Sequence, residues 1–357
     1  MNTYQPSRLI LVLIAIISLV VWGVACSKGG DTLPEDNTGL HPMPLIRPSN
    51  FPSFVYDTAS NPITKEGFEL GRKLFYDVKL SRNLTISCGF CHIQTSAFTQ
   101  HGHAVSHGID DRLGTRNSQP TFNLAWSKFF FWDGGVFNLD LQPLAPIKNH
   151  EEMDEDISNV IAKLKADAYY PKQFKRVFGS DNITATMMLK ALSQFMLQCV
   201  SANSRYDRFV RGDGVQLTNA ELAGKALFEQ KCASCHSTDL FTDNSFHNNG
   251  LPPGVINDKG RSMITLQAAD DYTFKTPTLR NLGYTPPYMH DGRFRTLHDV
   301  LDHYSSGVQN SPTLDPLLKQ GGVIGIPLTN TEKVQIIAFL NTLNDESFVR
   351  DPRFSEQ

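Results

Sequence analysis

The stretches Cys88-Gly89-Phe90-Cys91-His92 and Cys232-Ala233-Ser234-Cys235-His236 decide how this chain folds. Each has the pattern C-x-x-C-H, in which two cysteines form thioether bonds to a haem c and the following histidine ligates its iron. Together they use four of the six cysteines. The alternative, a zinc site shared by both pairs, usually needs the pairs at the short spacing of a ribbon or finger. The wide separation favours two covalently bound haem c groups.

The composition allows two ordinary domains and argues against one class of partner. The chain has 357 residues, of which 40% are hydrophobic, enough for packed cores. Its net charge is −3, and no basic stripe or arm is present. We therefore expect no nucleic-acid partner.

The N-terminus carries a targeting signal. Arg8 precedes an apolar run at 9–21, interrupted only by Ser18, which is long for a signal-peptide core and short for a comfortable membrane span. The sequence Val24-Ala25-Cys26 then resembles a bacterial lipobox, although Gly23 departs from the usual leucine. Residues 1–25 are therefore expected to be a signal peptide of the lipoprotein type, with Cys26 lipidated.

Two alternatives for this segment are a plain cleaved signal and an uncleaved anchor. All three place the body of the chain in the bacterial cell envelope, and the lipidated form would be periplasmic and membrane-anchored. Residues 26–50 are rich in Gly, Pro, Asn and Asp and are expected to be a flexible tether.

The segments around the two motifs form an internal repeat. Leu70-Gly71-Arg72-Lys73-Leu74-Phe75 precedes the first motif, and Ala223-Gly224-Lys225-Ala226-Leu227-Phe228 precedes the second. Thr218-Asn219-Ala220-Glu221 and Thr329-Asn330-Thr331-Glu332 are capping boxes that open helices. The final helix would pack across its partner. We therefore predict a mainly α fold of two cytochrome c-like lobes, each with one haem, long loops and little strand.

The rest of the chain is expected to be helical segments joined by long loops. Residues 154–164 and 185–203 have the apolar spacing of amphipathic helices, and Cys199 within the second is read as a buried structural thiol. The loops are expected at 105–121, 248–260 and 282–295. Loops of this length are usually functional.

Several further blocks carry a family resemblance that spans about residues 50–345. They are Gly114-Thr115-Arg116-Asn117, Pro120-Thr121, Phe131-Trp132-Asp133-Gly134, Gln142-Pro143-Leu144-Ala145-Pro146, Phe274-Lys275-Thr276-Pro277-Thr278-Leu279-Arg280-Asn281 and Pro287-Tyr288-Met289-His290-Asp291-Gly292. With these blocks the chain resembles the bacterial di-haem cytochrome c peroxidase and MauG family. The resemblance implies an N-terminal peroxidatic haem domain (51–211), a C-terminal electron-transfer haem domain (212–345) and a tail (346–357).

The resemblance also implies roles at the first haem. The haem on His92 would be the peroxide site, with Glu152 as general acid/base and Gln142 orienting the peroxide. From the residues alone, Glu152 would read as one solvated acid in an acidic run. Trp132 would lie between the haems and carry electrons, although a core aromatic is the simpler alternative.

Three further features are implied by the family resemblance. His107 would cap the resting peroxidatic haem, with His101 and His103 as weaker candidates and an exposed loop histidine as the alternative. A calcium ion would bind the Asn117 side chain and the carbonyls of Thr285 and Pro287, since Ca²⁺ prefers oxygen ligands. His290 would lie near the second haem.

The second haem shows an informative departure. The resemblance places Tyr304 where the peroxidases have a methionine ligand and MauG has a tyrosine. A methionine ligand raises the haem potential, whereas a phenolate should lower it. The alternatives are that Tyr304 is a core residue, or that Met289 or Met263 ligates instead.

Three functions follow as hypotheses. The first is a di-haem peroxidase that reduces hydrogen peroxide to water, with electrons from a small mono-haem cytochrome c or cupredoxin entering at the C-terminal haem. The second is a MauG-like oxidase acting on a protein or organic substrate through a high-valent state, which Tyr304 favours. The third is a non-enzymatic electron carrier, against which Gln142 and Glu152 argue. The oligomeric state stays open, with a homodimer as one alternative.

Overall fold

The structure is a computed structural model that describes residues 39–357. The predicted signal peptide, Cys26 and the first part of the tether lie outside the described residues. The fold is mainly α, as predicted, and its only regular strands within 39–357 are the short antiparallel pair β1 (Phe246–His247) and β2 (Phe274–Lys275). None of the helices in the described part is long and apolar enough to span a bilayer.

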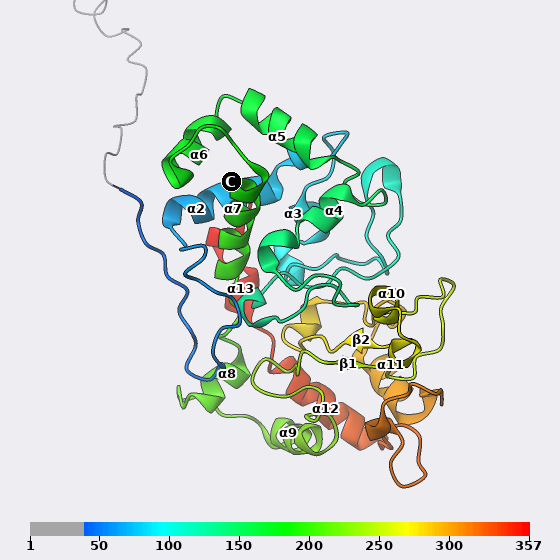
Figure 1. Ribbon diagram of the computed structural model, residues 1–357. Helices are drawn as coiled ribbons and strands as arrows, with labels where there is room; N and C mark the ends of the chain where they lie inside the picture. The colour runs from blue at the N-terminus through cyan, green and yellow to red at the C-terminus, as the bar shows by residue number, and fades with distance from the viewer. Residues whose placement is uncertain (1–38) are drawn as a thin grey trace, which may run out of the picture. The chain divides into compact units, whose positions relative to one another are not determined.

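The first helix pair is α2 (Lys65–Tyr76) crossing α7 (Ala185–Gln198) (Figure 1). Thr64 caps α2 by accepting a hydrogen bond from the Gly67 amide at 3.0 Å. The helices meet at Gly71, where an added Cβ would lie 1.9 Å from the carbonyl oxygen of Ala191. Only glycine permits this close approach.

The second helix pair, α9 (Asn219–Lys231) and α12 (Asn330–Asn341), repeats this crossing (Figure 1). An added Cβ on Gly224 would lie 1.9 Å from the carbonyl oxygen of Gln335. Both predicted capping boxes, at Thr218 and Thr329, are confirmed. The two Gly-containing segments that we predicted as a repeat therefore occupy equivalent helix crossings.

The remaining helices are short. Most of them lie in the sequence between the two members of a pair; α8 lies between the pairs and α13 follows the second pair. They are α3 (Cys88–Cys91), α4 (Leu144–Lys148), α5 (Ile157–Ala166), α6 (Tyr170–Phe178), α8 (Arg205–Val210), α10 (Ser262–Thr265), α11 (Leu297–Asp302) and α13 (Glu346–Val349). The helix expected at 154–164 begins three residues late because Asp154 has a left-handed backbone, with φ of 47°. The helix expected at 185–203 ends at Gln198.

Two hydrophobic clusters accompany the two helix pairs. The first is built on α2 and α7 and includes Phe75 and Phe195; the second is built on α9 and α12 and includes Phe228 and Phe339. Tyr206 belongs to the second cluster although it precedes the expected domain boundary at 211/212. The boundary itself stays a prediction.

The segment expected to be a tail is packed into the first cluster. Phe348 and Phe354 are buried, and the Phe348 ring lies 5.7 Å from that of Phe98. Burying these aromatic rings compensates for the cost of ordering the end of the chain. Residues 346–357 thus pack against the first cluster as part of the fold.

A buried ion pair joins distant segments of the fold. Arg280 donates two hydrogen bonds to Asp207, at 2.6 and 2.9 Å, and both side chains are fully buried. The guanidinium also donates to the Asp239 carbonyl at 2.7 Å. These contacts hold the Pro277–Asn281 part of the sequence against α8, on the C-terminal side of β2.

Candidate active site

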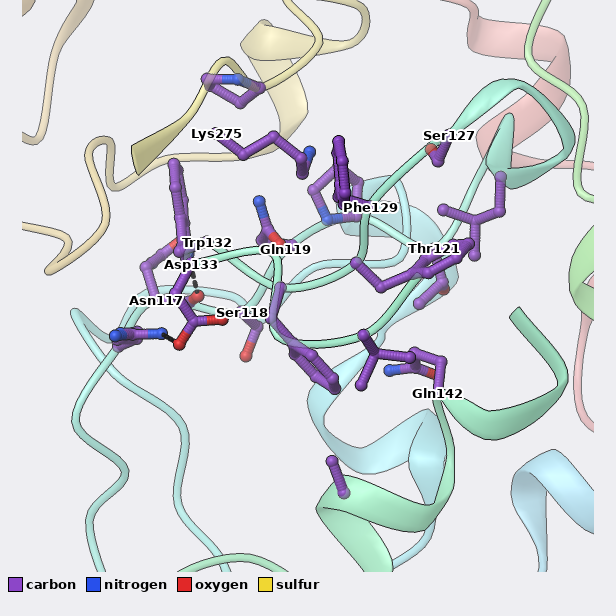
Figure 2. Close-up of a pocket in the computed structure, with 18 of the residues that line it drawn as sticks. Asn117, Ser118, Gln119, Thr121, Ser127, Phe129, Trp132, Asp133, Gln142 and Lys275 are labelled. Carbon is purple, nitrogen blue, oxygen red and sulfur yellow. Dashed lines mark hydrogen bonds and ion pairs between the residues drawn. The ribbon is translucent and has the colours of Figure 1, made fainter. Parts of the chain in front are cut away.

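A cavity of about 560 Å³ lies beside the first C-x-x-C-H motif. Its lining brings together Cys91, His92, Trp132, Gln142 and Glu152, which come from α3, the loop after it and the α4 region. Figure 2 shows Gln142 on the opposite side of this cavity from Lys275. All five residues were predicted, in four separate stretches of the sequence, and folding gathers them around one space.

The histidine of the first motif is oriented as an iron ligand requires. His92 Nδ1 lies 2.8 Å from the carbonyl oxygen of Phe98, so it carries the proton and donates. Nε2 is then the nitrogen that could ligate a metal, in place of the ring's second hydrogen bond, to the Gln119 backbone. Burial lowers the pKa of His92 and favours the neutral, ligating form.

The polar lining of the cavity also fits a prosthetic group. The hydroxyl of Thr121 is buried, lines the cavity and has no hydrogen-bond partner within the described residues. Buried polar groups are rarely left unpaired, so a bound group with acceptor or donor atoms would complete this wall. The donor set, the volume and this orphaned hydroxyl all fit a haem attached through Cys88 and Cys91.

Gln142 lies just before α4, and Glu152 lies in the turn that follows it. Asn149 donates to Glu152 Oε1 at 3.0 Å, which leaves Oε2 without a bond from that side chain. Burial raises the pKa of Glu152, the Asn149 hydrogen bond opposes this rise, and the charge of Glu151 adds to it. The Gln142 side chain makes no hydrogen bond to any other residue of 39–357 and borders the same space. Glu152 is thus a half-buried carboxyl on a cavity wall, and not a solvated member of its acidic run.

Trp132 lies where segments from both halves of the chain meet. Its indole Nε1 donates to the carbonyl oxygen of Asn117 at 2.9 Å. Its own carbonyl accepts from the Lys275 amide at 2.8 Å, and its ring centroid lies 6.5 Å from that of His290. The indole is therefore held between the cavity and the second half of the chain.

His107 does not line the cavity in this structure. Its Nδ1 lies 2.6 Å from Asp111 Oδ1, and its ring packs edge-on against His103 at 4.7 Å. His101 Nδ1 lies 3.2 Å from the Ser96 hydroxyl. A capping role for His107 would require the loop to turn its side chain inward, and that role stays a prediction.

The residues expected to bind calcium are brought into one neighbourhood. The Asn117 amide donates to the His290 carbonyl at 2.7 Å, and its side chain donates to the Ala104 carbonyl at 3.0 Å. Thr285 and Pro287 lie in the loop that leads to His290. Asn117 is thus tied to the end of this loop through His290, and the calcium site itself stays a prediction.

The second motif has the same proximal geometry and a different distal environment. His236 Nδ1 lies 3.1 Å from the Phe241 carbonyl, so Nε2 is again the nitrogen that could ligate a metal, in place of the ring's second hydrogen bond, to the Pro277 backbone. Tyr304 lies in a π-helical turn, His303–Gly307, that follows α11; such turns are frequent at functional sites. Burial raises the pKa of Tyr304 to about 12, and the thiols of Cys232 and Cys235 lie near enough to add to the rise.

Asn249 lies beside both candidate distal ligands of the second motif. A hydrogen bond from its side chain partly opposes the rise in the pKa of Tyr304 caused by burial. Its Nδ2 also lies 3.6 Å from the sulfur of Met289. Met263, the other candidate, is 59% exposed and so is poorly placed for a buried iron. The structure thus keeps Tyr304 and Met289 as the two candidates.

Comparisons with known proteins agree with this geometry. Residues 65–215 match the family model described as di-haem cytochrome c peroxidase. The chain is 36% identical over 352 residues to methylamine utilization protein MauG of Methylorubrum extorquens, covering 97% of each chain. It is 34% identical over 296 residues to cytochrome c551 peroxidase of Nitrosomonas europaea, covering 81% of this chain and 82% of that one.

The chain belongs to the di-haem cytochrome c peroxidase and MauG family. A solved MauG-like protein associated with microbial copper homeostasis superposes with a TM-score of 0.78 at 34% identity, covering 87% of this chain and 97% of the other. The di-haem peroxidase BthA of Burkholderia thailandensis, at 20% identity and a TM-score of 0.70, has the same fold. Members named as peroxidases and members named MauG are both enzymes, and the family implies two c-type haems in this chain.

Sequence reasoning missed three residues that the family fold brings to these sites. Asn149 bonds Glu152, Asn249 lies beside the two candidate ligands, and Lys275 borders the cavity from the second half of the chain. Asn149 and Asn249 lie in polar stretches that carry no distinguishing pattern. Lys275 was within a quoted block, but nothing in that block indicated a place beside the first motif.

Proposed function

We propose that the chain is a di-haem peroxidase that reduces hydrogen peroxide to water at the cavity beside His92. The observation that carries the proposal is the presence of Gln142 and Glu152 on the wall of the cavity that His92 also lines. A protein that only carried electrons would have no use for a cavity with a proton-transfer group beside its iron ligand. The non-enzymatic carrier is therefore the least supported of the three hypotheses.

The proton transfers belong to Glu152. The overall reaction takes one H₂O₂, two electrons and two protons to two waters, so a proton must reach the oxygen that leaves. Glu152 Oε2 takes a proton from one peroxide oxygen and returns it to the other, while Asn149 holds Oε1. Gln142 hydrogen-bonds the peroxide and keeps it within reach of that oxygen. A haem on His92 would supply the site at which the O–O bond is reduced.

Electrons would enter at the second motif and cross beside Trp132. A small mono-haem cytochrome c or a cupredoxin is the proposed donor. The indole is fixed by hydrogen bonds through Nε1 and its own carbonyl, to Asn117 and Lys275. An aromatic ring held in this way shortens the distance that an electron must cross between two separated sites.

A second candidate function is the MauG-like oxidation of a protein or organic substrate. Tyr304, buried near Cys232 and Cys235, favours it because an oxygen ligand stabilises oxidised iron over reduced iron. The high identity to a MauG protein over nearly the whole chain supports it as well. Both candidates use peroxide and the same acid/base residue, and they differ in the source of the electrons.

Steady-state kinetics distinguish the candidates. Peroxide consumption is measured with a reduced mono-haem cytochrome c or cupredoxin as donor, and separately with organic and protein substrates alone. Turnover with the redox-protein donor supports the peroxidase. Turnover only with organic or protein substrates supports the MauG-like oxidase, and no peroxide consumption in either assay contradicts both.

Three accompanying proposals concern the setting of the enzyme. We propose a periplasmic location with a lipid anchor at Cys26, a calcium ion at Asn117, Thr285 and Pro287, and haem domains at 51–211 and 212–345. Calcium is tested by dialysis against a chelator, with metal content and haem spectra measured before and after readdition. Anchoring is tested by detergent partitioning of the native protein and its Cys26→Ala variant.

A further inference from the structure

Lys275 is a largely buried lysine on the wall of the first cavity. It lies in β2, opposite Phe246, and only 9% of the residue is exposed. Figure 2 shows its side chain reaching toward the cavity from the side opposite Gln142. Among residues 39–357, its amine has no hydrogen bond and no ion pair.

The one acid whose charge acts on Lys275 is already engaged elsewhere. Asp243 bonds His247 Nε2 at 2.9 Å and the Ser245 amide at 2.9 Å. Burial lowers the pKa of Lys275 to about 8, with Asp243 weakly opposing the shift. At neutral pH most molecules would thus hold an ammonium group at a largely buried position with no counter-ion among the described residues, and such a charge is costly unless it is paired.

A partner of the right charge is available in the cavity once it holds a haem. Haem c carries two propionate carboxylates on the edge away from its thioether bonds. A carboxylate beside Lys275 would give the ammonium a charge-assisted hydrogen bond. Lysine suits this contact because its ammonium group is compact and its flexible stem lets that group reach a carboxylate.

We propose that Lys275 is the counter-ion of a propionate of the haem held by Cys88, Cys91 and His92. The proposal rests on the haem placement in the proposed function. It means that a residue of the second half of the chain fixes the edge of the first haem. Because the Lys275 amide also donates to the Trp132 carbonyl at 2.8 Å, the same residue ties that haem edge to the indole between the two halves.

The proposal sets a direction for the reduction potential. A nearby positive charge stabilises ferrous over ferric haem, so removing it should lower the potential of the first haem. Lys275→Met keeps the length and apolar stem of the side chain and removes the charge. Lys275→Arg keeps the charge and serves as the rescue variant. Lys259→Met is the matched control, because Lys259 is half exposed and paired with Asp271 at the surface.

The test is a spectroelectrochemical titration of the full-length di-haem protein, with resonance Raman spectra of the propionate bending mode. Mass spectrometry first establishes that each variant carries two haems. We expect Lys275→Met to shift the ferric/ferrous equilibrium of the first haem about tenfold toward ferric, which is about 59 mV for one electron, and to alter the propionate mode. Lys275→Arg and Lys259→Met should retain the wild-type potential.

An unchanged potential and propionate mode in Lys275→Met would overturn the ion pair and leave the peroxidase proposal standing if peroxide turnover persists. A shift of equal size in Lys259→Met would also overturn it, because the effect would then be one of net charge. If the potential shifts as expected but no variant or wild-type protein consumes peroxide, the proposed function alone fails.

Discussion

The two C-x-x-C-H regions share their scaffold and differ in what faces it. In each, a glycine allows one helix to contact the backbone of a later helix, and the Nδ1–H of the motif histidine donates a hydrogen bond to a backbone carbonyl. Beside His92 lies a cavity with Gln142 and Glu152, whereas beside the second motif lies the buried phenol of Tyr304. The repeat thus fixes the proximal side, and the segments outside the repeat set what each iron could do.

This difference shows which segments of a duplicated fold distinguish its two sites. The helix crossings tolerate almost no change, because a Cβ on Gly71 or Gly224 would lie 1.9 Å from a carbonyl oxygen. The distal residues come instead from the α4 region in one half and from the turn after α11 in the other. Substitutions in these loops should therefore alter one site without disturbing the other.

The largest expected effect is on proton transfer at the first region. Glu152→Gln keeps the size of the side chain and removes the acid/base group, so kcat/KM for peroxide should fall by about 10²–10⁴-fold. Glu229→Gln is the matched control, because Glu229 is exposed, pairs with Lys225 on α9 and does not line the cavity. Equal activity of Glu152→Gln and wild type would remove Glu152 from the proposed mechanism.

The next effect concerns the ligand of the second region. If Tyr304 ligates the iron, Tyr304→Met should raise the potential of that haem alone by an amount on the order of 0.1 V, within the roughly 0.8 V range that axial ligands cover. Met289→Leu should then leave both potentials unchanged. In the reverse pattern, Met289→Leu would lower the potential of the second haem and Tyr304→Met would leave it unchanged. That result would assign the ligand to Met289.

A smaller effect tests the shared scaffold. Gly71→Ala and Gly224→Ala should each lower the free energy of unfolding by about 1–3 kcal/mol, since overpacking forces the helices apart. Thermal unfolding followed at the absorbance of each haem should show loss at the first haem for Gly71→Ala and at the second for Gly224→Ala. Each variant is the control for the other, and an identical response of both haems to both variants would contradict two separately packed regions.

The smallest effect is a displacement of the pH profile. Burial raises the pKa of Glu152, and the proposed step needs its ionised form to accept the first proton. On acidification, kcat/KM should therefore begin to decline at a higher pH than it would with a glutamate of ordinary pKa. Below the pKa of Glu152 the decline should be about tenfold per pH unit. In kcat/KM profiles this acidic limb should vanish in Glu152→Gln, and a limb that survives the substitution belongs to another group.

The sequence predicted the features that depend on local pattern. The capping boxes at Thr218 and Thr329 and the paired glycines are readable because caps and close crossings demand particular residues at fixed spacing. Family register placed Gln142, Glu152 and Trp132, and folding brings all three to one cavity. Their roles remain proposals.

What the sequence did not predict depends on contacts between distant segments. The packing of Phe348 and Phe354 into the first cluster, and the arrival of Lys275 at the first cavity, join the two halves of the chain. No local periodicity encodes such contacts. Helix α6 was also missed, where Pro171 follows Tyr170 within the first turn and Gly179 ends the helix in a left-handed conformation.

The central claim is that the two regions are unequal, one open to peroxide and one closed by a protein ligand. It is tested most directly by adding peroxide to the diferric and half-reduced protein in a spectroelectrochemical cell, with the haems assigned by Tyr304→Met, which should move only the second. The account predicts that peroxide changes the spectrum through the first haem and that Glu152→Gln slows this change. Direct reaction at the second haem, or no reaction in either redox state, would contradict it.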